Sequence, residues 1–466
     1  MKKILILILV FIFSLGSLAL FSSTAAGDYH VQDGVLYSFT GLTTTVRIPA
    51  DVYYIADFAF KDNTRINRVI MHDNVKIIGN EAFYGCTALK TVEGTEGVAE
   101  VGAYAFHGTP FFLNQNTDII KLNSVVIGGE AKGELYLDDS VRSIAPYAFA
   151  ENTEITSVKA TNSLTSVGEG AFYRCTSLKT VDVGRSLSFI GPLAFYSTRF
   201  TGEYSGDFVV LGDGILVEYR GNSAEVILPE TIKRIGGGAF YYNTDIQKVS
   251  IPEGVTSIDA RAFMNCTKLS FVAFPQSLKV IGDEAFAKCK VLDDITIPEK
   301  VEVMGESIFY GCKALENVSF KNLTNIPKGT FSHCSSLKAL NLPGGITSIG
   351  EKAFENCTAL TDIAISEEVT EIGVGAFSGA DNLTVSAKQG SYAYEYCVNT
   401  GVNVIKAGDA NYDNKLNIRD ATAIQKHTAG VITLSFTEAV RADANFDGKI
   451  NVRDATYIQK ILAGMI

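Results

Sequence analysis

Apolar residues recur along residues 30–400 with a period of about 23 positions. Each period contains the dipeptide Ala-Phe or a close variant, and most of its phenylalanines lie 23 residues apart. A fixed period of this length is typical of a solenoid, in which stacking of coils buries the apolar face that one coil cannot bury alone. The recurring phenylalanines are Phe60, Phe83, Phe106, Phe149, Phe172, Phe195, Phe240, Phe263, Phe286, Phe309, Phe331, Phe354 and Phe377.

The repeat at residues 266–286 indicates which elements each coil contains. Val272 and Phe274 lie two positions apart, which predicts a short β-strand with one buried face. Pro275 ends this strand, because proline cannot donate a hydrogen bond to a ladder. The Gly-x-x-Ala-Phe segment that follows predicts a tight turn whose Phe286 fills the coil interior. In other strands the positions on either side of the buried centre should face outward, for example Lys248, Ser250, Asp294, Thr296, Asn317 and Ser319.

Two steps in the phenylalanine series are longer than the rest, 43 residues from Phe106 to Phe149 and 45 residues from Phe195 to Phe240. The segments 31–60, 118–149 and 207–240 open alike, with two strand patterns separated by a turn. We therefore expect β-hairpin insertions of about 20 residues at the two long steps, and three blocks of coils.

The Ile-Pro, Ile-Gly, Ala-Phe and Cys-x-x-Leu signature of residues 30–400 resembles the leucine-rich repeats of the bacterial surface-antigen (BspA-like) type. The resemblance implies a mainly β solenoid of about 23-residue coils with short turns or helices. It also implies a secreted or surface protein whose solenoid acts as a binding or adhesion surface. The tail Gly390-Ser-Tyr-Ala-Tyr-Glu-Tyr-Cys397 predicts a helical cap on the last coil.

Most of the eight cysteines occupy one slot, three residues after the repeat phenylalanine, where other coils carry Asn or Thr. We interpret this slot as a small, weakly polar side chain inside the coil. Stacked Cβ vectors run parallel, which is poor geometry for a disulfide, so we predict free thiols. The same interpretation is favoured over a catalytic pair for His333 and Cys334. The cysteines in the slot are Cys86, Cys175, Cys266, Cys289, Cys312, Cys334 and Cys357.

Near the C-terminus a short acidic loop occurs twice, beginning at Asp409 and at Asp443, and each copy runs into a helix of sequence Ala-Thr-x-Ile-Gln-Lys. Oxygen side chains at loop positions 1, 3, 5 and 12, with a backbone carbonyl at position 7, have the spacing of a calcium loop. No helix signal precedes either loop. We expect two Ca²⁺ ions. The predicted ligands are Asp409, Asn411, Asp413, Lys415 (carbonyl) and Asp420, then Asp443, Asn445, Asp447, Lys449 (carbonyl) and Asp454.

Residues 407–466 resemble a type I dockerin, the calcium-dependent module that joins proteins to cohesins on cellulosome scaffolds. The resemblance implies a small all-α calcium-binding domain that contacts a cohesin through loop positions 10 and 11 and the outer face of each exit helix. Ile424 and Ile458 are expected in the core of the module itself. The implied cohesin-binding residues are Ile418, Arg419, Thr422, Gln425 and Lys426, then Val452, Arg453, Thr456, Gln459 and Lys460.

The chain begins with Met-Lys-Lys, an apolar run and small residues, which predicts a secretory signal peptide over 1–26. The length of the apolar run leaves an uncleaved anchor as the alternative. After the signal peptide we expect the solenoid over 27–400, a linker over 401–406 and the dockerin over 407–466. The protein is thus expected to be secreted, with no further membrane segment.

The formal net charge of −11 argues against nucleic acid and against an anionic membrane surface as partners. No catalytic constellation stands out: the histidines fall at unrelated repeat positions, and acids such as Asp294 and Asp362 are scattered on strand faces. Phosphate-loop and zinc-ligand spacings are absent from the sequence. The chain contains no Trp, which weakens the case for a carbohydrate-binding platform, although it has 20 Tyr.

We therefore expect a secreted, non-catalytic repeat protein that docks to a cohesin and is associated with the cell surface through a scaffold. Its solenoid would bind a protein, a glycan or a cell surface during polysaccharide degradation. The alternatives are an enzyme of the same complex, such as a glycoside hydrolase or peptidase with its site on the solenoid, and a cell adhesion protein.

Overall fold

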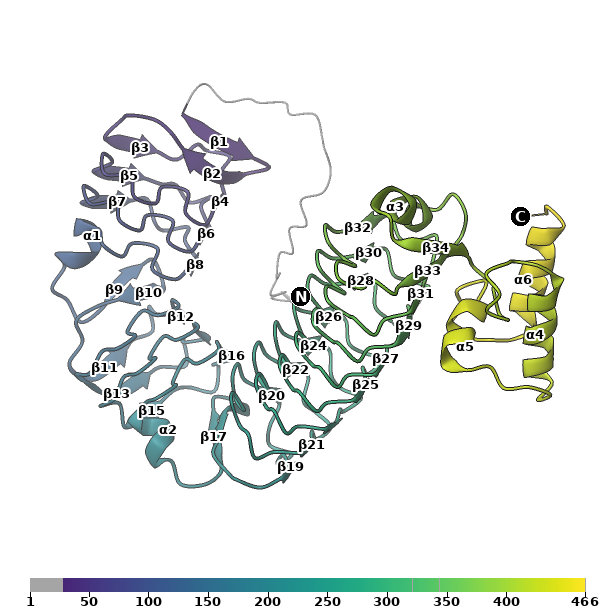
Figure 1. Ribbon diagram of the computed structural model, residues 1–466. Helices are drawn as coiled ribbons and strands as arrows, with labels where there is room; N and C mark the ends of the chain where they lie inside the picture. Colours follow the sequence, from purple (N-terminus) through teal and green to yellow (C-terminus); the bar gives the residue numbers. More distant parts are fainter. Residues whose placement is uncertain (1–27, 321, 343, 466) are drawn as a thin grey trace, which may run out of the picture. The chain divides into compact units, whose positions relative to one another are not determined.

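The computed structural model describes residues 28–320, 322–342 and 344–465 (Figure 1). The predicted signal peptide lies outside the described residues. The described chain divides into an N-terminal unit that ends at Cys289 and a C-terminal unit that begins at Lys290. Each unit is described by itself below.

The regular coil has the strand and turn that the apolar pattern predicts. Val46 pairs in parallel with Val69, one coil further along, and Val69 pairs with Val92 in the next coil. On the turn side, the amide of Phe60 donates to Ala82 O at 2.8 Å, and Phe60 stacks on Phe83 with ring centroids 4.7 Å apart. Each coil is therefore bonded to the next at both its strand and its turn. The phenylalanine column forms the core between them.

The predicted outward positions flank a buried centre in each of the three strands named above, Lys248–Ser250, Asp294–Thr296 and Asn317–Ser319. In all three the outer residues are exposed and the middle one is buried, which confirms this part of the prediction. The exposed side chains of these three strands are polar, but Ile227 and Phe271, which lie beside Ser250 and Lys248 in the same sheet, are exposed hydrophobic residues.

The N-terminal unit contains parallel ladders of short strands. The first block has β2 (Val35–Phe39), β4 (Tyr54–Ile55), β6 (Ile77–Ile78) and β8 (Glu100–Val101) in one sheet, and β3 (Thr45–Arg47), β5 (Arg68–Ile70) and β7 (Thr91–Glu93) in another. The second has β10 (Val125–Gly128), β12 (Ser143–Ile144), β14 (Ser166–Val167) and β16 (Phe189–Ile190), with β11 (Gly133–Leu137), β13 (Ile155–Ala160) and β15 (Thr180–Asp182). The third has β18 (Ile215–Tyr219), β20 (Arg234–Ile235), β22 (Ser257–Ile258) and β24 (Val280–Ile281), with β19 (Glu225–Ile227), β21 (Lys248–Ser250) and β23 (Phe271–Ala273).

An antiparallel hairpin opens each block. Its first strand is β1 (Tyr29–Gln32), β9 (Ile120–Leu122) or β17 (Phe208–Leu211), and these pair with β2, β10 and β18. The hairpins of the second and third blocks lie in the two long steps of the phenylalanine series. A short helix precedes each of those two, α1 (Pro110–Leu113) capped by Thr109 and α2 (Arg199–Glu203) capped by Thr198.

The C-terminal unit continues the same coil design and ends in helices. Its strands are β25 (Asp294–Thr296), β26 (Val303–Met304), β27 (Asn317–Ser319), β28 (Asn325–Ile326), β29 (Ala339–Asn341), β30 (Ser348–Ile349), β31 (Asp362–Ile365), β32 (Glu371–Ile372), β33 (Thr384–Ala387) and β34 (Asn403–Lys406). Its helices are α3 (Tyr392–Thr400), α4 (Ile418–Thr428), α5 (Phe436–Ala442) and α6 (Val452–Leu462). Among the described residues, no helix has the length and apolar character needed to cross a membrane.

Residues 401–406, predicted to be a linker, contain the whole of β34 (Asn403–Lys406). This strand pairs in parallel with β33, so that Val404 lies opposite Val385 and Ile405 opposite Ser386. The segment thus extends the sheet β29-β31-β33-β34 and leads into Ala407 without a free stretch of chain. Its β-branched residues, Val402, Val404 and Ile405, have the β-propensity that a short linker would not need.

All eight cysteines are buried and free, as predicted. The thiol of Cys86 donates to Phe60 O at 3.0 Å, and that of Cys175 donates to Phe149 O at 3.0 Å. Where Asn occupies the slot, as at Asn63, its side-chain oxygen instead accepts from two backbone amides of its own coil. A cysteine in this slot therefore donates a hydrogen bond to a backbone carbonyl, whereas an asparagine there accepts hydrogen bonds from backbone amides. Burial raises the pKa of the Cys86 thiol to about 11, which keeps it protonated and unreactive.

Candidate metal and partner-binding site of the C-terminal module

The C-terminal module, residues 407–465, packs α4 and α6 around a small core. Ile424 and Ile458 are fully buried in it, as predicted, together with small residues such as Ala421 and Ala455. A capping box starts each long helix: Asn417 pairs with Asp420, and Asn451 pairs with Asp454. The last acid of each loop is therefore held by the first turn of the helix that follows it.

The first loop gathers three carboxylates. Ligand atoms of Asp409, Asp413 and Asp420 lie within 4.8 Å of one another. Backbone amides fix their orientation: those of Asp413 and Asn414 donate to the two oxygens of Asp409, each at 3.0 Å. Asp420 likewise accepts from the amides of Asn411 at 3.2 Å and Asn417 at 2.8 Å. An all-oxygen donor set on a short loop fits a hard cation such as Ca²⁺.

The second loop repeats these hydrogen bonds. Asp443 accepts from the amides of Asp447 at 3.1 Å and Gly448 at 2.8 Å. Asp454 accepts from the amides of Asn445 at 3.3 Å and Asn451 at 2.9 Å. The side chains that would bind a second ion are thus oriented by the same backbone groups as in the first loop.

Protonation and metal binding compete at the last acid of each loop. Burial, followed by the charges of Asp443 and Asp447, raises the pKa of Asp454 to about 6. Burial also raises the pKa of Asp420, and the charges of Asp409 and Asp413 add to the shift. Without a cation these carboxylates are costly to ionise, and a divalent cation would offset that cost.

Two left-handed backbone positions shape each loop. Position 6 has φ +60° at Asn414 and +75° at Gly448, as the sharp turn there requires. Position 4, which the sequence analysis did not single out, is also left-handed, with φ +62° at Tyr412 and +58° at Phe446. An aromatic residue rarely adopts this conformation, so its side chain must be held by other contacts.

The prediction that no helix precedes either loop is wrong for the second one. Helix α5 ends at Ala442, directly before Asp443. Its start is a capping box in which Ser435 accepts from the amide of Glu438 and Glu438 accepts from the amide of Ser435. The Ser-x-x-Glu spacing is visible in the sequence and is the signal that identifies this helix.

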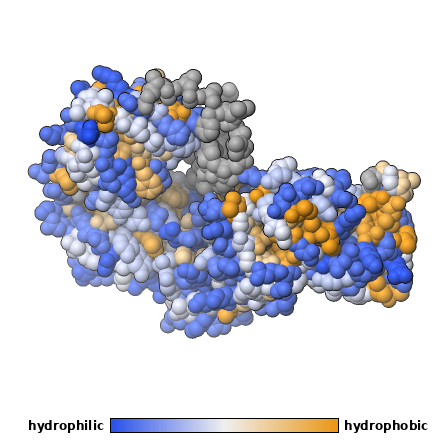
Figure 2. All heavy atoms as spheres, turned by 45° about the horizontal axis from the view of Figure 1, so that its top comes forward, coloured by the Kyte–Doolittle hydropathy of each residue, from blue (hydrophilic) through white to orange (hydrophobic). Residues whose placement is uncertain are grey.

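The residues predicted to bind a cohesin all lie on the surface. Ile418 is 57% exposed and Val452 is 60% exposed, although both begin helices whose other faces are buried. Figure 2 shows hydrophobic residues gathered at the end of the molecule that carries the C-terminal helices. A shallow hollow runs beside the second helix and is lined by Val452, Arg453, Thr456 and Lys460. The exposed members of the two sets are Ile418, Arg419, Thr422, Gln425, Lys426, Val452, Arg453, Thr456, Gln459 and Lys460.

A buried arginine joins the first loop to the solenoid strands of the same unit. Arg441 Nε lies 2.6 Å from Asp362 Oδ1, and Arg441 Nη1 lies 3.0 Å from Asp409 Oδ2. Nη1 also donates to Asn414 Oδ1 at 3.0 Å. The Tyr412 ring stacks on the guanidinium at 3.6 Å, and its hydroxyl donates to Asp362 at 2.9 Å. Asp362 lies on a strand, β31, as expected, and it is fully buried in this network.

The second loop contacts the same strands through apolar groups. Phe446 packs with Ala339 of β29, Ala364 of β31 and Val440 of α5 in one buried cluster. The position-4 side chains of both loops therefore contact the solenoid, while the residues at positions 10 and 11 are exposed. We call the contacts of Arg441, Tyr412 and Phe446 with β29 and β31 the module seat.

A family model for the BspA type leucine-rich repeat region, in six copies, matches residues 31–124, 132–203, 218–338 and 256–384. The chain belongs to this family. A model of the dockerin type I domain matches residues 407–463, so the C-terminal module is a dockerin. A search of curated proteins gave no match.

Solved structures of repeat proteins are similar to this chain. A leucine-rich cell surface protein from Faecalibacterium prausnitzii has 21% identity and a TM-score of 0.32, covering 80% of this chain and 98% of its own. The pneumococcal vaccine antigen PcpA has 17% identity and a TM-score of 0.32, covering 81% and 95%. A leucine-rich repeat protein from Eubacterium ventriosum has 19% identity and a TM-score of 0.32, covering 75% and 91%.

Proposed function

We propose that this protein is secreted and docks through its dockerin to a cohesin on a cellulosome-type scaffold, where its solenoid acts as a non-catalytic binding module. A type I dockerin implies binding to a cohesin domain. The observation that carries the proposal is the division of the dockerin surface. The residues at loop positions 10 and 11 and on the outer helix faces are exposed. The position-4 residues, Tyr412 and Phe446, contact the solenoid in the module seat.

Calcium is the cation that we propose for both loops. Type I dockerins bind calcium, and the carboxylates of Asp409, Asp413 and Asp420 supply hard oxygen ligands at the right spacing. Asn411 and the Lys415 carbonyl complete the set in the first loop. Asp443, Asn445, Asp447, Lys449 and Asp454 take the same roles in the second.

The two copies offer alternative cohesin faces. The exposed set that begins at Ile418 and the set that begins at Val452 have nearly the same side chains, and α4 and α6 present them alike. A cohesin that binds one set could bind the other after a rotation of about 180°. The seat leaves both sets open, so either orientation remains accessible in the full chain.

The test is titration calorimetry of the full chain without its signal segment against a panel of cohesins from the same organism, in calcium and then in EDTA. We expect tight binding to at least one cohesin in calcium only. Replacing Asp409 and Asp443 together by Ala should abolish it. Equal binding in EDTA would contradict the calcium role, and failure against the whole panel would contradict the docking function.

A graded set of variants tests the duplicate faces. Changing Ile418 and Arg419 to Ala should weaken binding little, because Val452 and Arg453 replace them. Changing all four should remove binding. If the first pair alone removes binding, only the first copy is used, and the two-face proposal is wrong.

A further inference from the structure

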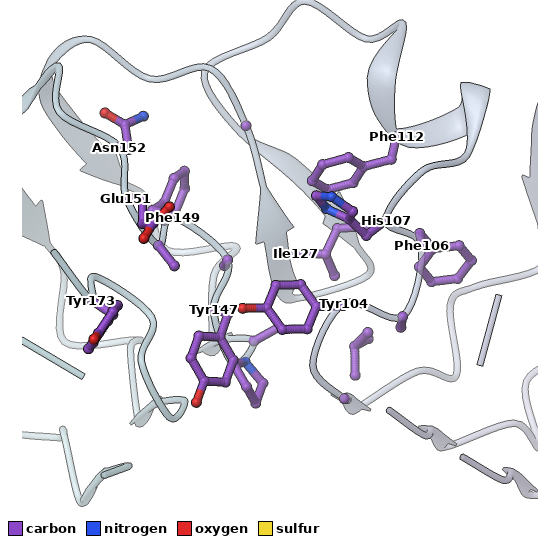
Figure 3. A pocket seen from close by; sticks show the side chains of 18 residues that line it. Tyr104, Phe106, His107, Phe112, Ile127, Tyr147, Phe149, Glu151, Asn152 and Tyr173 are labelled. Atoms are coloured by element: carbon purple, nitrogen blue, oxygen red, sulfur yellow. The ribbon is translucent and has the colours of Figure 1, made fainter. Parts of the chain in front are cut away.

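The second hairpin leaves a hollow in the turn side of the N-terminal unit. The hollow has a volume of about 500 Å³ and lies between the turn around Phe106 and the turn around Phe149 (Figure 3). This is within the range of small-molecule sites, roughly 300–1,000 Å³. The phenylalanine column is broken here. Phe83 stacks on Phe106 at 5.1 Å, but Phe106 then meets Phe111 of the α1 segment edge-on, and stacking resumes with Phe149 and Phe172.

A comparison of the three hairpins explains why the hollow forms. Val35, Val125 and Ile215 hold the same register against the next strand of their sheets, so their fifth residues, Phe39, Gly129 and Tyr219, correspond. Phe39 packs on Phe60 at 5.5 Å, and Tyr219 packs on Phe240 at 5.1 Å.

Gly129 has no ring to place against Phe149. It has φ +150°, and a Cβ there would approach Asp118 O at 2.1 Å, so this position must be glycine. The second block therefore lacks the side chain that fills the corresponding space in the other two.

The missing turn also leaves backbone groups without partners. In regular coils, the amides of Glu81 and Phe83 donate to carbonyls of the next turn at 2.8 Å. The amides of Tyr104 and Phe106 occupy the equivalent positions and line the hollow, yet no acceptor for them is found among the described residues. On the opposite wall the carbonyls of Pro146, Ala148 and Ala150 likewise receive no donor from the described part of the chain. One wall thus offers donors and the other offers acceptors.

Aromatic faces border the same space. Tyr104 is 41% exposed and stacks on Tyr147 with centroids 5.1 Å apart and an interplanar angle of 17°. The Tyr147 hydroxyl donates to Glu169 at 2.9 Å, and Glu169 also bonds Arg261 at 2.8 Å, which fixes the ring. His107 lies edge-on to Tyr104 at 5.8 Å, and Figure 3 shows His107, Phe112 and the tyrosines around the hollow.

The coil position directly after the repeat phenylalanine forms a row that is aromatic on both sides of the hollow, and a small residue, Ala150, occupies this position at the hollow itself. The residue after the repeat phenylalanine is aromatic in the neighbouring coils, where Tyr84 stacks on His107 at 5.8 Å and Tyr173 stacks on Tyr196 at 5.7 Å. Between His107 and Tyr173 the same position is Ala150, which lines the hollow. The gap in the row and the gap in the core coincide.

We propose that this hollow, the junction pocket, binds one or two rings of a neutral saccharide. A sugar ring has C–H faces that pack on tyrosine and hydroxyl groups that both donate and accept, which suits the two backbone walls. The Glu151 carboxylate beside the pocket disfavours an anionic sugar. A peptide that took the place of the missing turn would have to adopt left-handed residues, as at Tyr104 with φ +54°, and would lose more conformational entropy than a rigid ring.

The proposal rests on the proposed role of the solenoid as a binding module and names its ligand class. The experiment is calorimetry of the full chain without its signal segment against cellohexaose, xylohexaose and mannohexaose. Polygalacturonate serves as the anionic comparison, and a peptide spanning Gly168–Arg174 represents a regular turn. We expect binding of at least one neutral hexasaccharide. Binding of none at millimolar concentration, or of polygalacturonate or the peptide alone, would overturn the proposal.

Ala150→Tyr places a ring in the gap of the aromatic row and should weaken binding at least tenfold. Met264→Tyr is the matched control, because Met264 follows Phe263 at the same coil position away from the pocket and is similarly half-buried. Tyr104→Ala, which removes an exposed wall of the pocket, should also weaken binding at least tenfold. Unchanged binding in both pocket variants would assign the saccharide to another surface.

Cohesin binding is measured on the same samples. It should be equal in all of these variants, because the junction pocket and the dockerin lie in different parts of the chain. Loss of saccharide binding with cohesin binding intact therefore tests the pocket alone. Loss of both saccharide and cohesin binding would indicate that the variant is misfolded. The other of the two pocket variants, Ala150→Tyr or Tyr104→Ala, then tests the proposal.

Discussion

The two acidic loops of the dockerin match at the proposed ligand positions but have different contacts with the rest of the unit. The first loop meets the solenoid through polar groups: Tyr412 and Asn414 both contact the guanidinium of Arg441. The second meets it through the apolar ring of Phe446. Position 4 is Tyr in the first loop and Phe in the second, and position 6 is Asn in the first and Gly in the second. At positions 8 and 10 both loops carry aliphatic residues.

This difference shows how a duplicated module acquires a unique orientation. The proposed ligand positions and the exit helices of the two copies are alike, so nothing in them distinguishes one copy from the other. The module seat breaks this symmetry, because only the first loop can pair with Arg441 and only the second presents Phe446 to Ala339 and Ala364. Under the proposed function a cohesin would meet either exit helix, while the solenoid meets the dockerin in one way.

Arg441→Ala should have the largest effect on this arrangement. The side chain is 4% exposed, and its removal leaves the Asp362 carboxylate buried without a cation, whereas Asp409 loses this ion pair but keeps its proposed metal site. Leaving one side of a buried ion pair uncompensated costs about 3–5 kcal/mol. We expect a loss of this size in the free energy of unfolding of the C-terminal unit, measured in urea with hydrogen exchange of α5 as the local readout.

Lys388→Ala is the control for this variant. Lys388 pairs with Glu367 at 2.6 Å, but the two side chains are 43% and 53% exposed. Exposed pairs contribute about 0–1 kcal/mol. Equal losses in the two variants would show that the buried network does not hold the dockerin in place.

Gly344→Ala tests the contact of the second loop with the solenoid. A Cβ at Gly344 would approach Phe446 O at 2.6 Å, and a backbone atom cannot easily move away. Overpacking of this kind costs about 1–3 kcal/mol. Gly345→Ala is the matched control, because its Cβ would meet only Leu323 O at 3.7 Å. We expect faster proteolysis at the dockerin boundary for Gly344→Ala alone, and equal proteolysis of the two variants would count against the seat.

The fold was largely predictable from the sequence, whereas the seat was not. The phenylalanine period identifies the coils because every coil repeats the same local contacts, as Phe60 does on Phe83. The contact between Arg441 and Asp362 joins residues far apart in the sequence, and neither carries a local pattern. Asp362 was predicted to be one of several scattered acids for this reason.

The junction pocket was only partly predictable from the sequence. Aligning the three hairpins places Gly129 opposite Phe39 and Tyr219, so the missing ring is visible in the sequence once the blocks are compared. The backbone groups without partners that line the pocket are not visible in the sequence. They arise because no turn lies between the turn around Phe106 and the turn around Phe149.

Acid should weaken calcium binding. The pKa of Asp454 is raised to about 6 and that of Asp420 is raised as well, so a proton must leave before the ion binds at lower pH. We expect the calcium affinity to be nearly constant above pH 7 and to fall below pH 6 by up to about tenfold per pH unit for each proton released.

The metal-free dockerin should respond to pH in the opposite sense. A carboxyl whose pKa is raised by folding contributes stability at low pH and loses it as the pH rises through about 6. In EDTA the dockerin should therefore be more stable at pH 5 than at pH 7, and in calcium less stable at pH 5. The same sign of change in both conditions would be inconsistent with the buried acids as the ligands.

Exchanging the residues at position 6 should give the smallest effects and distinguishes the two loops directly. Asn414→Gly keeps the left-handed backbone but removes the hydrogen bond from Arg441 at 3.0 Å, at a cost of about 1 kcal/mol. Gly448→Asn places a side chain where no atom lies within 4 Å of the new Cβ, and Asn tolerates φ +75°, so a few tenths of a kcal/mol are expected. Thermal unfolding of the calcium-loaded chain measures both. If Gly448→Asn were the more costly exchange, position 6 would be set by the turn itself, and Asn414 would not be part of the seat.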